Sequence, residues 1–408
     1  MTGNSLERFR RSAKTLKAGY ESGSPDELTR ITMIHPRNDG ADLKHADYLH
    51  VIVRESNFAS RPAMKAAIGT LGVDRAQRLQ RLKTALHAGQ AGIVAKLLAD
   101  TPDLAAGHFG LLCALNDVQS AWAMLRDDST CAVTAAGPYS PLVHLCRSRM
   151  FKVWPDKAND AIAIAEMLVA NGADVNAGNE HAGGQLSRLY WALGDAGHMD
   201  VAAWLLDHGA DPNDGESLYR ATELGHDDGL RLLLRHGADP EGTNALARAL
   251  DFDSVEMVGL LLNGNADPNE GADAEATDIK LRRGIPALHQ AARRMSSGVV
   301  LDLLLKNGAD PAALWHGHSA YVFAAIFGNA DLVARLDALD QASSLTDMEQ
   351  MLAQAAKGNV GDGFIDADKL SAQYRGILLE ILHLPDKLPH LKALVALHVS
   401  IFYNDLLP

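Results

Sequence analysis

The chain has 408 residues, more than one compact helical domain holds, so several domains or an extended array of repeats is expected. Hydrophobic residues make up 47% and charged residues 22%, which is typical of a folded protein and excludes a disordered one. The net charge of −13 repels phosphate backbones and argues against general nucleic-acid binding, whereas a basic protein surface would be attracted.

Aromatic residues are only 5% of the chain while Ala and Leu are prominent, a composition that favours an all-α fold of closely stacked helices. Cys113, Cys131 and Cys146 are an odd number without metal-ligand spacing, which suits a reducing compartment. No apolar run has the length of a signal-peptide core or of a membrane span. We therefore expect a cytoplasmic protein, and export as an effector through a non-cleaved signal stays open.

Residues 1–75 are predicted to form an N-terminal helical module. An amphipathic helix flanked by Arg and Lys is indicated by apolar residues three and four apart: Leu6, Phe9, Ala13, Leu16 and Tyr20. Its apolar face either caps a repeat array or lies on a membrane, and we favour the cap because the ends of repeat arrays need covering. A second helical stretch is predicted over residues 45–68.

The segment HPRNDGA, residues 35–41, partly resembles the HPFxxGN signature of Fic-type nucleotidyl transferases. Arg37 stands where that signature has Phe, Ala41 where it has Asn, and Leu43 where a phosphate-binding Arg would sit. We therefore interpret the segment as a loop that begins at Pro and ends in a Gly turn.

Residues 76–160 keep paired helical runs without a regular stop and are interpreted as degenerate repeats. Between Arg147 and Asp160 an irregular insertion sets Phe151 and Trp154 among cationic residues. Two interpretations stay open: the aromatic side chains lie at a partner interface, or Trp154 is buried against its own helices.

Five near-copies of one short sequence end successive helical runs within residues 161–345. They are GADVN at 172–176, GADPN at 209–213, GADPE at 237–241, NADPN at 265–269 and GADP at 308–311. Each follows a helix with one apolar face, and its Gly or Asn then takes the left-handed conformation that ends the helix. The Pro that follows Asp in four copies forbids further helix. These residues are therefore predicted to be structural stops.

With these stops, the tight corners Gly197-His198 and Gly225-His226, and the segment PALHQAA over 286–292, the chain resembles the ankyrin-repeat family. It resembles bacterial members that carry a helical N-terminal module. The resemblance implies a solenoid whose units each hold a turn, a first helix, a tight corner and a second helix. It also implies that a protein partner binds to the concave face, which the turn tips and the first helices form.

The stops begin at positions 172, 209, 237, 265 and 308, so they are 37, 28, 28 and 43 residues apart, against a family period of about 33. The short units are expected to lose their projecting hairpin, at Asp214-Gly215 and near Gly242. The long unit carries an acidic insertion over 270–280, which is either a binding loop or a passive surface loop. Residues 346–408 are predicted to be a C-terminal helical cap.

No GxGxxG, Walker, GxSxG or HExxH motif is present. Neither His316 and His318 nor the pair His45 and His50 has the spacing of a zinc site. We expect His316 and His318 to point to solvent from a turn, and His289 to hydrogen-bond within its own turn. No metal, cofactor or catalytic residue is assigned, and a non-enzyme is favoured over an enzyme.

Counting back from each corner predicts which first-helix positions escape the core and contact a partner. They are Ala192 and Asp195, Arg220 and Glu223, Arg248 and Asp251, Gln290 and Arg293, and Phe323 and Phe327. The row alternates in charge and then becomes aromatic. It either docks a partner helix of mixed charge through one apolar anchor, or its acids and arginines pair with each other across stacked repeats.

Two functions are therefore expected as alternatives. The first is a scaffold or adaptor that binds a protein through the concave face, a host protein if the chain is an exported effector. The second is an enzyme, or a binder of a small molecule or metal, with its site between the N-terminal module and the concave groove. A cluster of His35, His45 and His50 with carboxylates would favour the second.

Overall fold

The computed structural model describes residues 2–34, 43–56, 60–61, 64, 74–135, 137–152, 154–181, 184–272, 284–359, 363–366, 369–375 and 377–399. The chain forms two compact units, Met1–Trp204 and Leu205–Pro408, whose border falls within helix α11 (Met199–Asp207). Within the described residues, no helix has both the length and the apolar character that crossing a bilayer requires.

The first unit begins with three helices that share a core of their own: α1 (Thr2–Glu21), α2 (Pro25–Ile34) and α3 (His45–Glu55). Ala13 and Leu16 on α1 are buried together with Tyr48 and other apolar residues of α3. The predicted amphipathic helix is therefore present, and its apolar face packs against α3, a partner that the sequence analysis had not considered. The second helical stretch is shorter than predicted, because α3 ends at Glu55.

The rest of the first unit consists of short helices paired as in degenerate repeats. These elements are α5 (Arg75–His87), α6 (Ala91–Asp100), α7 (Phe109–Ala114), α8 (Val118–Asp127), η1 (Ser129–Ala132), α9 (Pro141–Cys146), η2 (Met150–Lys152), η3 (Pro155–Lys157), α10 (Ala158–Ala170) and the π-helix η4 (Tyr190–Ala196). Helix α7 packs against α9, α9 against η4, and α8 against α10. This alternation gives two layers of helices within the unit.

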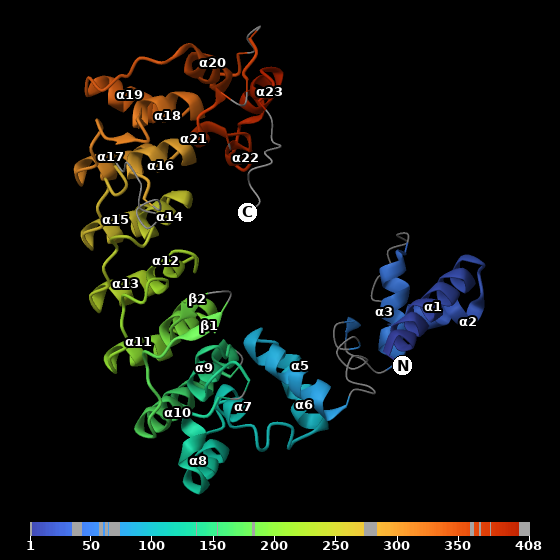
Figure 1. Cartoon of the computed structure of the whole chain (residues 1–408). Helices are drawn as coiled ribbons and strands as arrows, with labels where there is room; N and C mark the ends of the chain where they lie inside the picture. The colour runs from blue at the N-terminus through green and yellow to red at the C-terminus, as the bar shows by residue number, and fades with distance from the viewer. Residues whose placement is uncertain are drawn as a thin grey trace. The chain divides into compact units, whose positions relative to one another are not determined.

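The second unit is a regular solenoid of helix pairs. Its elements are α12 (Ser217–Ala221), α13 (Asp228–Arg235), α14 (Ala245–Asp251), α15 (Val255–Asn263), α16 (Ala287–Arg294), α17 (Gly298–Lys306), α18 (Ala320–Phe327), α19 (Ala330–Ala338), α20 (Asp347–Ala356), α21 (Ala372–Arg375), α22 (Ile377–Ile381) and α23 (Leu388–Ala396). The first helices α12, α14, α16, α18 and α20 stack in one layer, and the second helices α13, α15, α17 and α19 stack in the other (Figure 1).

The helix stops have the predicted backbone. Gly209 and Gly308 have φ of 88° and 89°, and Asn265, which replaces Gly, has φ of 68°. Gly adopts this left-handed region without strain and Asn more readily than most other residues, so the choice of residue favours the end of the helix here. The predicted stops are confirmed.

Two antiparallel hairpins project from the turns: β1 (Asn179–His181) with β2 (Gly184–Leu186), and β3 (Leu314–Trp315) with β4 (His318–Ser319). Residues 211–216 and 239–244, in the two short units, form turns without strands. The predicted loss of these hairpins is therefore confirmed. The acidic insertion over 270–280 lies almost wholly outside the described residues.

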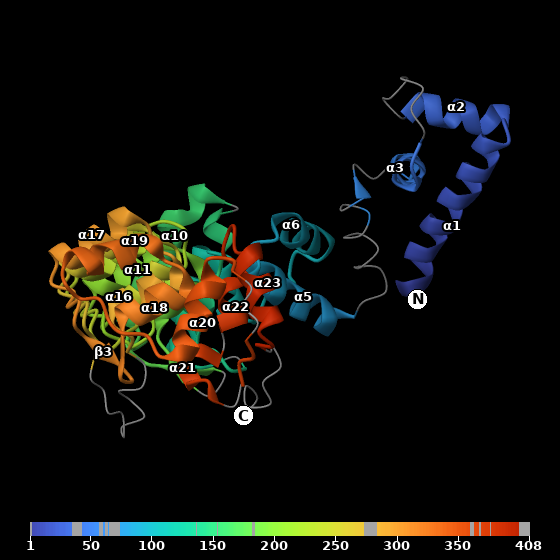
Figure 2. The ribbon, with the colours of Figure 1, turned by 90° about the horizontal axis from the view of Figure 1, so that it is seen from above.

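After the last repeat, the chain folds back along the first-helix layer. Helix α23 packs against α20, and α22 packs against α16, on the side of that layer that faces away from α17 and α19 (Figure 2). Lys387 donates a buried hydrogen bond of 2.7 Å from Nζ to the carbonyl oxygen of Phe327 at the end of α18. The segment after α20 is thus attached to the solenoid through its first helices.

Candidate partner-binding surface

Charged side chains on α12 and α14 form ion pairs between consecutive repeats. Arg220 pairs with Glu223 along α12. Glu223 Oε1 accepts hydrogen bonds from Arg248 Nε and Nη2 at 3.0 and 2.8 Å, and Arg248 Nη1 lies 2.8 Å from Asp251 Oδ2. The hydrogen bond to Asp251 raises the pKa of Arg248 above its ordinary value, so the guanidinium stays charged.

The ion pairs continue onto α16 and α22. Asp251 Oδ1 accepts hydrogen bonds from Gln290 Nε2 at 2.6 Å and Arg294 Nε at 2.7 Å. Arg293 Nη1 lies 3.3 Å from Gln290 Oε1, and Arg293 also pairs with a carboxylate of α22. We call the whole set the charged ladder: Arg220, Glu223, Arg248, Asp251, Gln290, Arg293, Arg294 and Glu380. The pairing across stacked repeats that the sequence suggested is therefore present.

One aromatic side chain beside the ladder is open to solvent. Phe252, directly after α14, is 50% exposed, and its ring centroid lies 4.8 Å from Arg248 Cζ. The half-buried ring of Tyr219 lies 6.0 Å from the same atom. The prediction from the sequence missed Phe252 because it selected the positions five and two residues before each corner, here Arg248 and Asp251. Phe252 directly precedes the corner, where Asp253 has φ of 49°.

The comparison with family models decides what these repeats are. The model described as "Ankyrin repeats (3 copies)" matches residues 157–244 and, overlapping, residues 189–272. These matches include the stops at 172, 209 and 237 and the corners before α11 and α13. Residues 157–272 of the chain are therefore ankyrin repeats.

Among solved structures, the ankyrin repeat domain of human ASB11 is similar, with 19% sequence identity and a TM-score of 0.39. The match covers 62% of this chain and 100% of the ASB11 chain. No curated protein sequence matches the chain.

The prediction that Phe323 and Phe327 escape the core of the ankyrin array is wrong. Both side chains are fully buried, and their rings stack 6.0 Å apart. The ring of Tyr374, from the segment that folds back, lies 5.5 Å from that of Phe323. Phe327 was also placed out of register, because the residue two before the corner at Gly328 is Ile326, which is buried as well.

Two further predicted positions are more buried than expected. Ala192 is fully buried in the first unit, and Gln290 is only 5% exposed in the second. Asp195, in the first unit, is not part of the charged ladder. Its carboxylate is 3.4 Å from His87 Nδ1 and 3.7 Å from Arg149 Nη2.

Two histidine predictions also need correction. His318 does not point to solvent, because its Nδ1 atom lies 2.7 Å from the hydroxyl of Tyr374, which donates to Glu349 Oε1 at 2.9 Å. Burial, and then the nearby Glu349 carboxylate, raises the pKa of Tyr374, so its hydroxyl stays protonated. His289 bonds outside its own turn, with Nε2 3.0 Å from the carbonyl oxygen of His318. His316 is exposed, as predicted.

The insertion after Arg147 folds into η2 and η3. The ring centroid of Phe151 lies 4.0 Å from that of His198, and Trp154 lies beside Lys157 at 5.6 Å. Both aromatic side chains are half-buried, so they contact their own unit rather than standing free in solvent.

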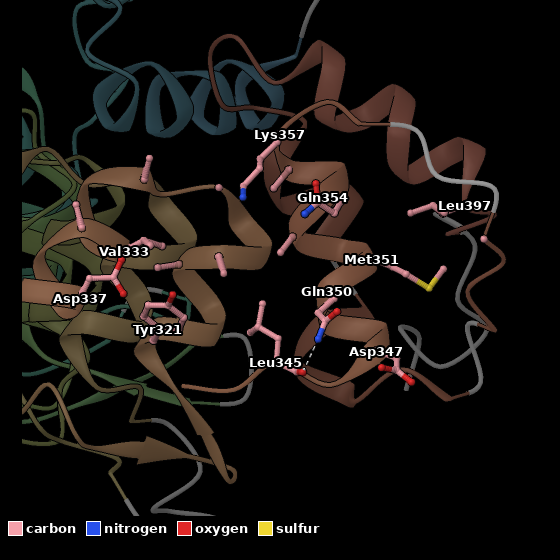
Figure 3. A pocket seen from close by; sticks show the side chains of 18 residues that line it. Tyr321, Val333, Asp337, Leu345, Asp347, Gln350, Met351, Gln354, Lys357 and Leu397 are labelled. Carbon is pink, nitrogen blue, oxygen red and sulfur yellow. Dashed lines mark hydrogen bonds between the residues drawn. The ribbon is translucent and has the colours of Figure 1, made fainter. Parts of the chain in front are cut away.

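A cavity of about 950 Å³ lies between α18, α19 and α20 (Figure 3). Six of its 18 lining residues are alanines, Val333 and Met351 add apolar surface, and Asp337, Asp347 and Lys357 bring charge to it. The layer of second helices ends at α19, whereas the first helices continue to α20 (Figure 1). The cavity thus occupies the place where one more second helix would stack.

In the described part of the chain, no group of three or more His, Cys, Asp or Glu side chains could hold a metal ion. His45 and His50 are both exposed on α3. His35 and the whole HPRNDGA segment lie outside the described residues, so the structure adds nothing about them.

Proposed function

We propose that this protein is a scaffold or adaptor that binds a protein partner through the first-helix face of α12 and α14. Ankyrin repeats are generally modules of protein–protein interaction. The observation that carries the proposal is the half-exposed Phe252 ring, which lies against Arg248 of the charged ladder.

This arrangement has the features of an interface hot spot. An aromatic side chain that loses its remaining exposure on binding supplies affinity, and the charges around it set the register of the partner. The ladder arginines and carboxylates are already held by one another, so they lose little side-chain freedom on binding. We infer a partner segment with one apolar anchor and charges of both signs.

The proposed surface is narrower than the sequence suggested. Phe323 and Phe327 are buried, and α22 covers part of α16 by pairing with Arg293. The binding surface we propose therefore consists of Tyr219, Arg220, Arg248 and Phe252. We place this function in a reducing cytoplasm, that of the producing cell or of a host cell after export, because all three cysteines are free.

The test compares partner recovery in affinity purification by the wild-type chain and by a Phe252→Ala, Arg220→Ala variant. The matched control is Val299→Ala, which removes an apolar side chain of 62% exposure from α17 in the opposite layer. We expect the double variant to lose the partner and the control to keep it, with equal urea midpoints for all three. Equal recovery by the double variant and the control would contradict the proposed surface.

A further inference from the structure

A second cavity, of about 280 Å³, lies in the first unit between α5, α7 and α9. The C-terminal end of α5 is tied to the turn after α9, where the backbone N–H of Arg149 donates to the carbonyl oxygen of Leu86 at 3.1 Å. The cavity opens beside this contact, and residues from all three helices line it.

The cavity collects basic side chains in a strongly acidic protein. Lys83 and His87 on α5, His144 on α9 and Arg147 after α9 all line it, whereas none of its lining residues is Asp or Glu. Lys83 forms no ion pair with any carboxylate in the described part of the chain. The chain as a whole carries a net charge of −13, so the positive charges of Lys83 and Arg147 are opposite in sign to the net charge of the chain.

Arg147 is held rigidly at this site. Its guanidinium carbon lies 4.3 Å from the ring centroids of both Tyr139 and Trp191, and Nη2 lies 3.3 Å from His87 Nε2. Its buried Nε atom has no hydrogen-bond partner among the described residues. A guanidinium held against two rings loses little freedom on binding an anion.

His144 is positioned by a close approach of two helices. A side chain at Gly110 on α7 would place its Cβ 2.5 Å from His144 Cδ2, so only Gly leaves room for the imidazole there. The ring also makes an edge contact of 5.9 Å with Tyr139. The side chains of Arg147 and His144 are therefore both fixed by packing.

The residues that line the cavity favour an organic carboxylate over an inorganic anion. Leu86, Leu111 and Pro138 give it apolar surface next to the cations. A free inorganic anion would leave that surface unused, whereas a carboxylate on an aliphatic stem uses both. We propose that this cavity binds the glutamate or aspartate side chain of an acidic segment of a protein partner. This proposal rests on the proposed function, which supplies the protein partner.

The test uses the full chain and a fluorescein-labelled hexaglutamate peptide, with binding measured by fluorescence anisotropy at pH 7. Lys83→Glu and, independently, Thr84→Glu place a carboxylate at the cavity. The matched control is Lys96→Glu on α6, which makes the same charge change at a residue that does not line the cavity. We expect Lys83→Glu and Thr84→Glu each to weaken peptide binding at least tenfold and Lys96→Glu less than twofold. We also expect a labelled hexaglutamine peptide not to bind.

Two results would overturn the proposal: no binding of the hexaglutamate peptide, or an equal loss for Lys83→Glu and Lys96→Glu. A competition arm tests the class of anion. Glutarate should displace the peptide at lower concentration than inorganic phosphate at equal ionic strength, and the reverse order would reject a carboxylate in favour of a phosphate. The peptide assay does not depend on Phe252 or Arg220. If the Phe252→Ala, Arg220→Ala variant keeps the protein partner, the peptide result can therefore still be interpreted.

Discussion

Arg293 on α16 and Glu380 on α22 are joined by two contacts of 2.8 Å, from Nε and Nη2 to the two carboxylate oxygens. The two residues are 87 positions apart in the chain. Their side chains are only 19% and 18% exposed, so water screens the pair weakly. This ion pair attaches the segment after α20 to the first-helix layer.

A double-mutant cycle of Arg293→Ala and Glu380→Ala measures that attachment. We expect a coupling free energy of about 1–2 kcal/mol, because a two-point arginine–carboxylate pair with little exposure is stronger than a surface pair. The free energies of unfolding come from urea titrations. The exposed pair Lys369 and Asp366, at 3.6 Å, serves as control and should couple by less than about 0.5 kcal/mol. Equal coupling in both cycles would contradict the prediction.

Gly328→Ala should destabilise the chain more than Gly209→Ala. Both residues have positive φ, of 80° and 88°, so both changes carry the same backbone strain of about 1 kcal/mol. At Gly328 the new Cβ would also lie 3.1 Å from Lys387 Nζ and 3.2 Å from Ala356 Cβ, whereas at Gly209 nothing lies within 4 Å. Urea midpoints of the two variants give the comparison, and identical shifts would show that Lys387 and Ala356 move aside freely.

Stability should fall as the pH drops from 7 to 5, in part because of His390. Burial, and then the charge of Lys387, lowers the pKa of His390 to about 4, below its usual value near 6.5. Between pH 6.5 and 4, His390 is therefore protonated in the unfolded chain but neutral in the folded chain. The stability present above pH 6.5 is lost as the pH falls toward 4. The loss from this one group amounts to about 2 kcal/mol between pH 7 and pH 5.

The variant His390→Leu isolates this contribution. Neither ring nitrogen of His390 has a hydrogen-bond partner among the described residues, so Leu leaves no polar group unsatisfied. Urea titrations at pH 7 and pH 5 should show a smaller loss for this variant than for the wild type. His316→Gln, at an exposed position, should keep the wild-type loss. A wild-type loss in His390→Leu would assign the pH dependence to other groups, such as the buried His289 and His198.

The three thiols should differ in reactivity toward a disulfide reagent such as DTNB. Burial raises the pKa of Cys146 to about 12, and it raises the pKa of the buried Cys113 as well, so neither forms thiolate at pH 8. Cys131 is partly exposed and should react alone in the native chain. In the wild-type chain we expect one thiol to react before denaturation and three after it. In the Cys131→Ser variant we expect no thiol to react before denaturation and two to react after it.

Prediction from the sequence succeeded where one residue controls the local backbone. Gly209, Gly308 and Asn265 stop their helices because of their own conformational range, and the lost hairpins follow from the 28-residue spacing. It failed at Phe323, which looks like an exposed position of the repeat but is covered by a segment that contributes Tyr374. It also missed Phe252, which directly precedes the corner at Asp253, because only the positions two and five residues before each corner were counted.

The repeat pattern reflects the residues that each repeat unit buries against its neighbours, since those contacts recur from one unit to the next. It therefore predicted the solenoid, its stops and the charged positions of the first helices. Which of those positions face solvent depends on residues from much farther along the chain, such as Glu380 against Arg293. The cavity around Arg147 likewise forms only where α5 meets α9. Such contacts follow no period, so only the folded chain determines them.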